Sequence, residues 1–195
     1  LHLHDWNAWE PCEDADLLDS DQSFVITPPP RTEDTPPGPA LIICPGGGYE
    51  FVSFQNEGTP IQTVAEKRGY VSFMLRYKIA PSRYPEPQLD LLETIRYVRD
   101  NAAKYHVDPD RIGIVGFSAG GHLCASTAAL YRTLMPEARP NAVVLGYPVI
   151  SLEKDIAHEG SALAMIGNDD ETLRHELSVE TLIHTHYPPT FAWAC

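Results

Sequence analysis

The sequence has little positive charge. Its 195 residues include 14 lysine and arginine residues and 27 aspartate and glutamate residues, which gives a formal net charge of −13 at pH 7. A chain this acidic repels the phosphates of nucleic acids and the headgroups of anionic lipids. We therefore expect no nucleic acid and no membrane among its partners.

Long apolar runs and paired cysteines are also missing. No apolar run reaches the roughly 18 residues of a membrane-spanning helix, and the N-terminus shows no basic-then-apolar signal pattern. The four cysteines are scattered without a CxxC pair, which argues against a zinc site or a disulfide framework. Cys44 and Cys124 lie within apolar runs and are predicted to be buried free thiols. We expect no metal or organic cofactor, and a reducing, cytoplasmic compartment.

The sequence contains enough apolar residues for one core, since 43% of it is hydrophobic. Residues 1–39 are acidic and rich in proline and are expected to form an N-terminal arm with a short edge strand over residues 23–27. Residues 40–195 are expected to form the folded domain. Asp155, Asp169 and Asp170 are interpreted as solvated turn residues.

Apolar runs alternate with amphipathic stretches along the domain. The runs predict buried strands at residues 40–44, 70–75, 111–116 and 142–146. Helices are predicted from Thr59, as N-cap, to Gly69, and over residues 86–105 and 119–131. This alternation predicts an α/β fold, with a mostly parallel central sheet and helices on both of its faces.

The remaining segments are less regular. Asp108-Pro109-Asp110 is predicted to be a turn, and residues 148–187 to be a polar excursion with a short helix over residues 171–177. Residues 191–195 are predicted to enter another buried strand, parallel to the strand at residues 142–146. The sequence stops inside this strand.

One motif has the form GxSxG. Gly116-Phe117-Ser118-Ala119-Gly120 follows a strand and precedes a helix rich in small residues, which is the context of a nucleophile elbow. The sharp turn strains the backbone of the serine, and the positive end of the helix faces the developing oxyanion. Ser118 is therefore the predicted nucleophile.

A second motif, Pro45-Gly46-Gly47-Gly48-Tyr49, directly follows a strand. Consecutive glycines let backbone N–H groups approach a ligand closely, and losing one oxyanion donor costs an acyl-transfer enzyme about 2.7–4 kcal/mol. The competing interpretation is a phosphate-binding loop. Neither GxGxxG nor GxxxxGK[ST] spacing occurs nearby, which argues against it.

Four motifs in this order resemble the α/β-hydrolase esterases of the acetyl-xylan-esterase-like group, which is related to the hormone-sensitive-lipase type. They are Cys44-Pro45-Gly46-Gly47-Gly48-Tyr49, Leu75-Arg76-Tyr77, Asp108-Pro109-Asp110-Arg111-Ile112-Gly113 and Gly116-Phe117-Ser118-Ala119-Gly120-Gly121-His122-Leu123. The resemblance implies an oxyanion hole of the Gly47, Gly48 and Ala119 N–H groups. It also implies acetyl or other small acyl esters of carbohydrates as substrates. Pro45 replaces the histidine of the lipase-type loop, as is common in the acetyl-xylan-esterase-like branch.

The general base and its acid are not identified in the sequence. In this fold they follow the nucleophile in the order Asp, His, and the resemblance places both beyond the strand that begins at Phe191. His122 matches a structural histidine of the family. The four later histidines are expected to be structural or exposed and out of hydrogen-bond reach of Ser118 Oγ: His158, His175, His184 and His186.

Three explanations for the missing base stay open. The chain is truncated at its C-terminus, a second chain or second copy completes it, or it is a degenerate binding protein without catalysis. The stop within an apolar strand favours truncation. A further enzymatic alternative is a prolyl-oligopeptidase-like peptidase, which shares the fold and the elbow.

Overall fold

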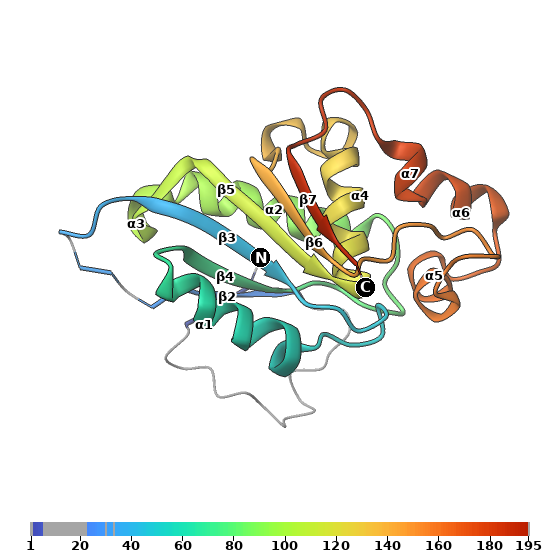
Figure 1. The fold of residues 1–195 in the computed structure, drawn as a ribbon, viewed down its shortest axis with the longest axis horizontal. Coiled ribbons are helices and arrows are strands. Elements are labelled where there is room, and N and C mark those ends of the chain that lie inside the picture. Colours follow the sequence, from blue (N-terminus) through green and yellow to red (C-terminus); the bar gives the residue numbers. More distant parts are fainter. Residues whose placement is uncertain (1, 6–22, 30, 33, 195) are drawn as a thin grey trace.

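The computed structural model describes residues 2–5, 23–29, 31, 32 and 34–194. Within these residues the structure has one seven-stranded sheet of order β1-β2-β4-β3-β5-β6-β7 (Figure 1). Only the β2–β4 pairing is antiparallel. The strands are β1 (His2–Asp5), β2 (Phe24–Thr27), β3 (Gly38–Cys44), β4 (Val71–Arg76), β5 (Val107–Phe117), β6 (Ala142–Gly146) and β7 (Thr190–Trp193).

Helices lie in the connections between the strands. They are the π-helical turn η3 (Phe54–Gly58), α1 (Thr59–Lys67), α2 (Glu86–Asp100), α3 (Ala102–Tyr105), α4 (Ser118–Leu134), the 3₁₀ turn η4 (Pro136–Ala138), α5 (Glu159–Ile166), α6 (Glu171–Leu177) and α7 (Val179–Leu182). In the described part of the chain, no helix is both long and apolar enough to cross a membrane. The mostly parallel α/β sheet predicted from the alternating pattern is confirmed.

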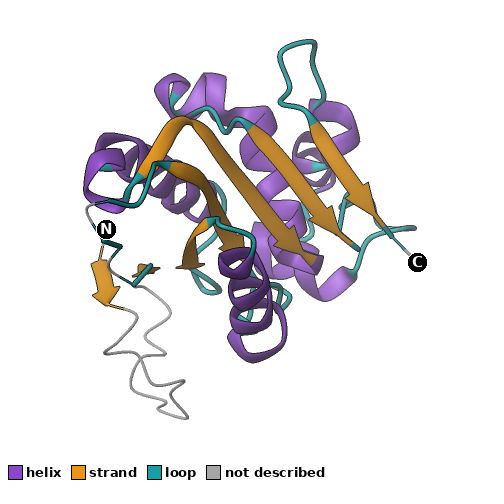
Figure 2. Cartoon of the chain, turned by 60° about the vertical axis from the view of Figure 1, so that its left-hand side comes forward, coloured by secondary structure: helices purple, strands orange, loops and turns teal. Residues whose placement is uncertain are grey.

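The sheet divides the core into two apolar clusters because successive strand residues point to opposite faces. Ile42 and Ile114 belong to the larger cluster, together with apolar side chains of α2 and α4. Ile43 and Val115, their neighbours in sequence, belong to the smaller cluster, against which Ile61 of α1 packs. Helices therefore cover both faces of the sheet, as Figure 2 shows.

Several predicted boundaries differ from the observed ones. Gly58, not Thr59, is the N-cap of α1, because the π-helical turn η3 brings the chain into the helix one residue earlier. The single helix predicted over residues 86–105 is two helices, which meet at Asn101. The side-chain amide of Asn101 donates a hydrogen bond to the Tyr97 carbonyl (2.9 Å) and so competes with continuation of the helix.

The predicted turn at residues 108–110 is wrong, since these residues lie within β5. The register of β5 against β3 shifts between Gly38 and Ala40, which accommodates the extra residues as a bulge. The Asp110 N–H donates to Asp108 Oδ1 (3.0 Å) inside this bulge. The residues that suggested a turn are thus accommodated in the irregular part of β5.

The N-terminal arm contributes to the sheet. Residues 24–27 form β2 as predicted, but β1 pairs outside it, so β2 is not the edge strand. The predicted domain boundary at residue 40 falls inside β3. Residues 6–22 of the arm lie outside the described residues.

β7 runs parallel to β6 as predicted, with Thr190 opposite Val143. The prediction that this strand is buried is wrong: Phe191 is 67% and Trp193 is 50% exposed. The physical reason is the strand order, because β7 is the last strand of the sheet and pairs only with β6 among the described residues.

The excursion at residues 148–187 contains α5, α6 and α7, of which only α6 was predicted. Its centre is Arg174, a fully buried side chain that donates to the Leu152 carbonyl (2.9 Å) and to both carboxylate oxygens of Glu159. The guanidinium also contacts Asp169 (3.1 Å). Asp170 caps α6 by accepting the Leu173 N–H. Asp169 and Asp170 are thus not merely solvated turn residues, as the sequence had suggested.

Replacing Arg174 by alanine is expected to lower the free energy of unfolding by about 3 kcal/mol. The substitution leaves the Leu152 carbonyl without its donor and creates a void among α5 and α6. Chemical denaturation at pH 7 measures the change. The control is Lys154→Ala, which removes an exposed cation paired with Asp169 and Glu171, and is expected to have no measurable effect. Equal stability of the two variants would contradict this role of Arg174.

Candidate active site

Ser118 occupies the turn between β5 and α4. Its backbone φ angle is 50°, in the left-handed region that favours glycine, and such strain is found mainly at functional sites. The Ser118 carbonyl accepts the Val149 N–H (3.0 Å), which ties the turn to the segment after β6. The strained turn predicted from the GxSxG motif is confirmed by this angle.

The elbow needs glycine two residues beyond the serine because the chain following β3 passes there without clearance. A Cβ atom on Gly120 would lie 2.1 Å from the Cys44 carbonyl oxygen and 2.5 Å from the Pro45 carbonyl oxygen. No backbone tolerates such contacts, so the absence of a side chain lets the two segments meet. The first turn of α4 therefore packs directly on the start of the glycine loop.

The glycine loop itself reaches the serine. A Cβ atom on Gly46 would lie 2.9 Å from Ser118 Cβ and 2.7 Å from the Phe117 carbonyl oxygen. Gly47 and Gly48 follow with φ angles of 136° and 67°. The structure thus brings the loop against Phe117 and Ser118. Convergence of the Gly47, Gly48 and Ala119 N–H groups on Ser118 Oγ stays a prediction.

Two buried tyrosines support the loop. The Tyr77 hydroxyl donates to the Pro45 carbonyl (2.7 Å), and Tyr49, whose φ angle is 62°, directs its hydroxyl to His122 Nδ1 (2.8 Å). The two phenol rings meet edge to face with centroids 5.8 Å apart. Burial raises the pKa of both hydroxyls. They therefore keep their protons at neutral pH and remain hydrogen-bond donors.

His122 connects the loop to the excursion. Its Nε2 contacts the Leu177 carbonyl (2.9 Å), and a carbonyl only accepts, so Nε2 carries the proton. Nδ1 is then the acceptor for the Tyr49 hydroxyl. Burial lowers the pKa of the imidazole. His122 is thus a neutral structural residue, which agrees with the prediction.

Glu57 is a site residue that sequence reasoning missed. Its Oε2 accepts the Gly46 N–H (2.6 Å), and its Oε1 accepts the Tyr147 hydroxyl (2.9 Å). The residue lies on the π-helical turn η3, a segment for which the sequence had no periodic signal. The sequence offers only a weak clue, since Glu57 is one of two acidic residues, with Glu50, between the glycine loop and the Thr59-Pro60 helix start.

Three of the four later histidines have hydrogen-bond partners away from the elbow. His158 contacts Ser161 Oγ (2.8 Å), His175 contacts Glu153 (2.8 Å), and His184 contacts the Ala129 carbonyl (3.0 Å). Among the described residues, Ser118 Oγ has no hydrogen-bond partner. No histidine or carboxylate is therefore placed here as its base.

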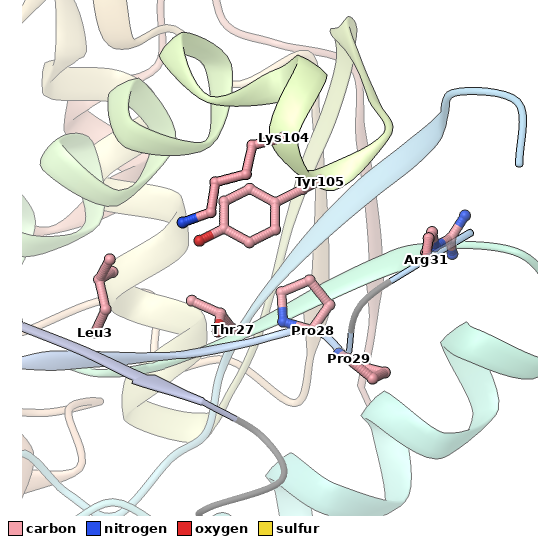
Figure 3. A pocket seen from close by; sticks show the side chains of 7 residues that line it. All are labelled: Leu3, Thr27, Pro28, Pro29, Arg31, Lys104 and Tyr105. Atoms are coloured by element: carbon pink, nitrogen blue, oxygen red, sulfur yellow. The ribbon is translucent and has the colours of Figure 1, made fainter. Parts of the chain in front are cut away.

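A separate cavity of about 360 Å³ lies away from Ser118. Figure 3 shows Arg31, Lys104 and Tyr105 among its lining side chains. Lys104 and Tyr105 directly precede β5, whereas Ser118 directly follows it, so the cavity and the elbow lie at opposite ends of this strand. The part of the chain that the structure describes also contains no cluster of acidic, histidine or cysteine side chains arranged to hold a metal ion.

The chain is similar in sequence and fold to known proteins. The family model BD-FAE matches residues 26–191. The chain is 33% identical over 160 residues to an acetylxylan esterase of Xylanibacter ruminicola, which covers 80% of this chain and 32% of that protein. It is 32% identical to endo-1,4-beta-xylanase B of Butyrivibrio fibrisolvens, over 78% of this chain and 26% of that protein. The chain spans a third or less of the length of these two curated relatives.

Solved structures agree. An acetyl ester-xyloside bifunctional hydrolase from Caldicellulosiruptor lactoaceticus superposes with a TM-score of 0.79 at 35% identity, over 95% of this chain and 71% of that one. A lipase/esterase from Lactobacillus plantarum gives a TM-score of 0.70 at 29% identity, over 84% of this chain and 70% of that one.

Gly120→Ala is expected to lower the free energy of unfolding by about 2–3 kcal/mol, because the new methyl group collides with the backbone of the glycine loop. Thermal and chemical denaturation measure the loss. Gly160→Ala in α5 is the matched control: its Cβ meets nothing closer than 3.6 Å, and the change is expected to be neutral or slightly stabilising. Equal effects at the two positions would contradict the close approach at the elbow.

His122 is expected to make the protein less stable as the pH falls below about 6.5, the usual pKa of an unfolded-chain histidine. Its folded-state pKa is lowered by burial, so the unfolded chain binds more protons in this range and stability rises with pH. His122→Gln should flatten the dependence of unfolding free energy on pH between about 6.5 and 5. An unchanged slope in His122→Gln would refute the assignment.

Proposed function

Because the chain belongs to the BD-FAE family of α/β-hydrolases, we propose that it hydrolyses carboxylic esters through an acyl-enzyme on Ser118. The observation that carries the proposal is the contact between two motifs far apart in sequence. The strained turn of Ser118 meets the glycine loop so closely that neither Gly46 nor Gly120 has space for a side chain. A nucleophile and a row of backbone donors need this proximity for acyl transfer.

In the proposed reaction, Ser118 Oγ attacks the ester carbonyl carbon, and the carbonyl oxygen becomes an oxyanion. The N–H groups of Gly47, Gly48 and Ala119 stabilise this oxyanion. Its collapse breaks the ester bond, releases the alcohol and leaves an acyl group on Ser118. Water then attacks the acyl group by the same route and releases the carboxylic acid.

A general base must take the Ser118 proton and return it to the leaving alcohol. Ser118 Oγ has no hydrogen-bond partner among the described residues, so we assign this role to none of them. The proposed chemistry of this chain is therefore nucleophilic attack and oxyanion stabilisation. This observation also favours a second candidate function, a binding protein that keeps the fold without catalysis.

We propose acetyl esters of carbohydrates as the substrate class. The support is the similarity to two proteins, an acetylxylan esterase and an acetyl ester-xyloside bifunctional hydrolase, each at least 33% identical to this chain. We also propose a reducing compartment such as the cytoplasm. Its support is that Cys44 and Cys124 are both buried and free.

Ser118→Ala in the full-length protein is expected to lower kcat on p-nitrophenyl acetate by at least about a thousandfold. Mass spectrometry of the unsubstituted protein should detect an acetyl group on the Ser118 peptide early in turnover. Ser126→Ala is the control, since this serine lies on the same helix but contacts Gln88, and its activity should stay within about twofold. Undiminished turnover by Ser118→Ala would exclude Ser118 as nucleophile. If the unsubstituted protein does not turn over the ester, the binding-protein alternative is favoured. If it cleaves peptides and not esters, the peptidase alternative is favoured.

A further inference from the structure

We propose that Glu57 is a positioning residue for ester hydrolysis, which holds the glycine loop in its oxyanion-binding conformation. The inference rests on the proposed function of Ser118. It starts from the Gly46 N–H, which donates to Glu57 Oε2 at 2.6 Å. A hydrogen bond from a backbone N–H to a carboxylate is shorter and about twice as strong as one between neutral groups.

The carboxylate reaches the loop at the residue nearest to the nucleophile. The point where a Gly46 Cβ atom would stand lies 2.8 Å from Glu57 Oε2 and 2.9 Å from Ser118 Cβ. Glu57 and Ser118 therefore flank Gly46 from two sides. Any rotation of the Gly46 peptide moves Gly47 and Gly48, whose N–H groups are the proposed oxyanion donors.

The segment that carries Glu57 also binds the carbonyl group of Gly46. The Ser53 N–H donates to the Gly46 carbonyl (2.9 Å), and the Glu57 N–H donates to the Ser53 carbonyl (3.0 Å). Both polar groups of the Gly46 backbone are thus bound by one short segment. The π-helical turn η3 is half-buried around Glu57 and leads directly into α1, which anchors it to the sheet.

The Glu57 carboxylate also has a hydrogen-bond partner on the far side of the Ser118 turn. The Tyr147 hydroxyl donates to Glu57 Oε1 (2.9 Å), and Tyr147 directly follows β6. In the sheet, β5 lies between β3 and β6, so the Glu57–Tyr147 pair joins the segments on the two sides of the strand that presents Ser118. Tyr147 has a φ angle of 36° and its ring lies near Phe117, with centroids 5.7 Å apart.

This arrangement distinguishes positioning from a direct charge effect. A carboxylate beside an oxyanion hole repels the developing negative charge, so charge alone would make Glu57 a hindrance. Its contribution to catalysis must therefore come from its two hydrogen bonds, with the Gly46 N–H and the Tyr147 hydroxyl, which fix the loop. Glutamine at this position retains an acceptor for the Gly46 N–H and a donor for the Tyr147 oxygen without the charge, and should therefore replace glutamate.

The first experiment measures amide hydrogen exchange in the full-length protein and needs no activity. Glu57→Ala is expected to accelerate exchange of the Gly46 amide roughly tenfold to hundredfold, as loss of a charge-assisted hydrogen bond predicts. Asp170→Ala is the matched control, because Asp170 also accepts a backbone N–H, that of Leu173, away from the elbow. It should accelerate the Leu173 amide and leave Gly46 unchanged. An unchanged Gly46 amide in Glu57→Ala overturns the proposal.

The second experiment measures kcat and KM on p-nitrophenyl acetate. Glu57→Ala is expected to lower kcat roughly tenfold to hundredfold with KM within about twofold, because the oxyanion forms only in the transition state. Glu57→Gln should keep most of the activity, and Tyr147→Phe should give a smaller loss than Glu57→Ala. Asp170→Ala should match the unsubstituted protein.

The outcomes separate this proposal from the assignment of Ser118. Retained kcat in Glu57→Ala despite faster Gly46 exchange overturns the positioning role, and so does a Glu57→Gln variant as impaired as Glu57→Ala. If Ser118→Ala remains active, the proposed function fails, whereas the exchange data still decide whether Glu57 holds the loop. If Glu57→Ala does not fold, the Gly46 amide in Tyr147→Phe decides: faster exchange supports the proposal, and unchanged exchange overturns it.

Discussion

A backbone collision that only glycine avoids governs the candidate site. The Cys44 carbonyl lies where a Cβ of Gly120 would be, so the end of β3 and the first turn of α4 touch through bare backbone. Ser118 has its strained φ angle within this contact. Backbone strain of this kind costs roughly 1–3 kcal/mol and persists only where the surroundings over-determine it. The packing of β3, β5 and α4 provides that constraint.

Hydrogen bonds from polar side chains around the glycine loop stabilise its conformation. Tyr77 and Tyr49 hold the loop from the core, and Glu57 holds it from the side of α1. Each contact joins the loop to a different part of the fold, namely the end of β4, α4 through His122, and η3. Such a network resists rotation of any single peptide group of the loop. Each rotation would break a hydrogen bond that water cannot readily replace in this half-buried region. A preorganised oxyanion hole needs this resistance.

The excursion after β6 is connected to the same network. His122 accepts the Tyr49 hydroxyl and donates to Leu177 in α6, so the loop and the excursion share one neutral imidazole. Arg174 in turn orders α5 and α6 around Leu152. Buried hydrogen bonds of His122 thus connect the glycine loop with the end of α6.

The sequence by itself determined the alternation of strands and helices from β3 to β6, the elbow at Ser118 and the glycine loop, because apolar periodicity and glycine motifs are local properties. Tertiary structure alone decided the rest. The turn signal at residues 108–110 was absorbed into β5 by its register against β3, and the apolar residues of β7 are exposed because their place depends on strand order. Glu57 could not be identified from its neighbours in sequence. Its role depends on Gly46 and on Tyr147, 90 residues away, which only the folded sheet brings to the same carboxylate.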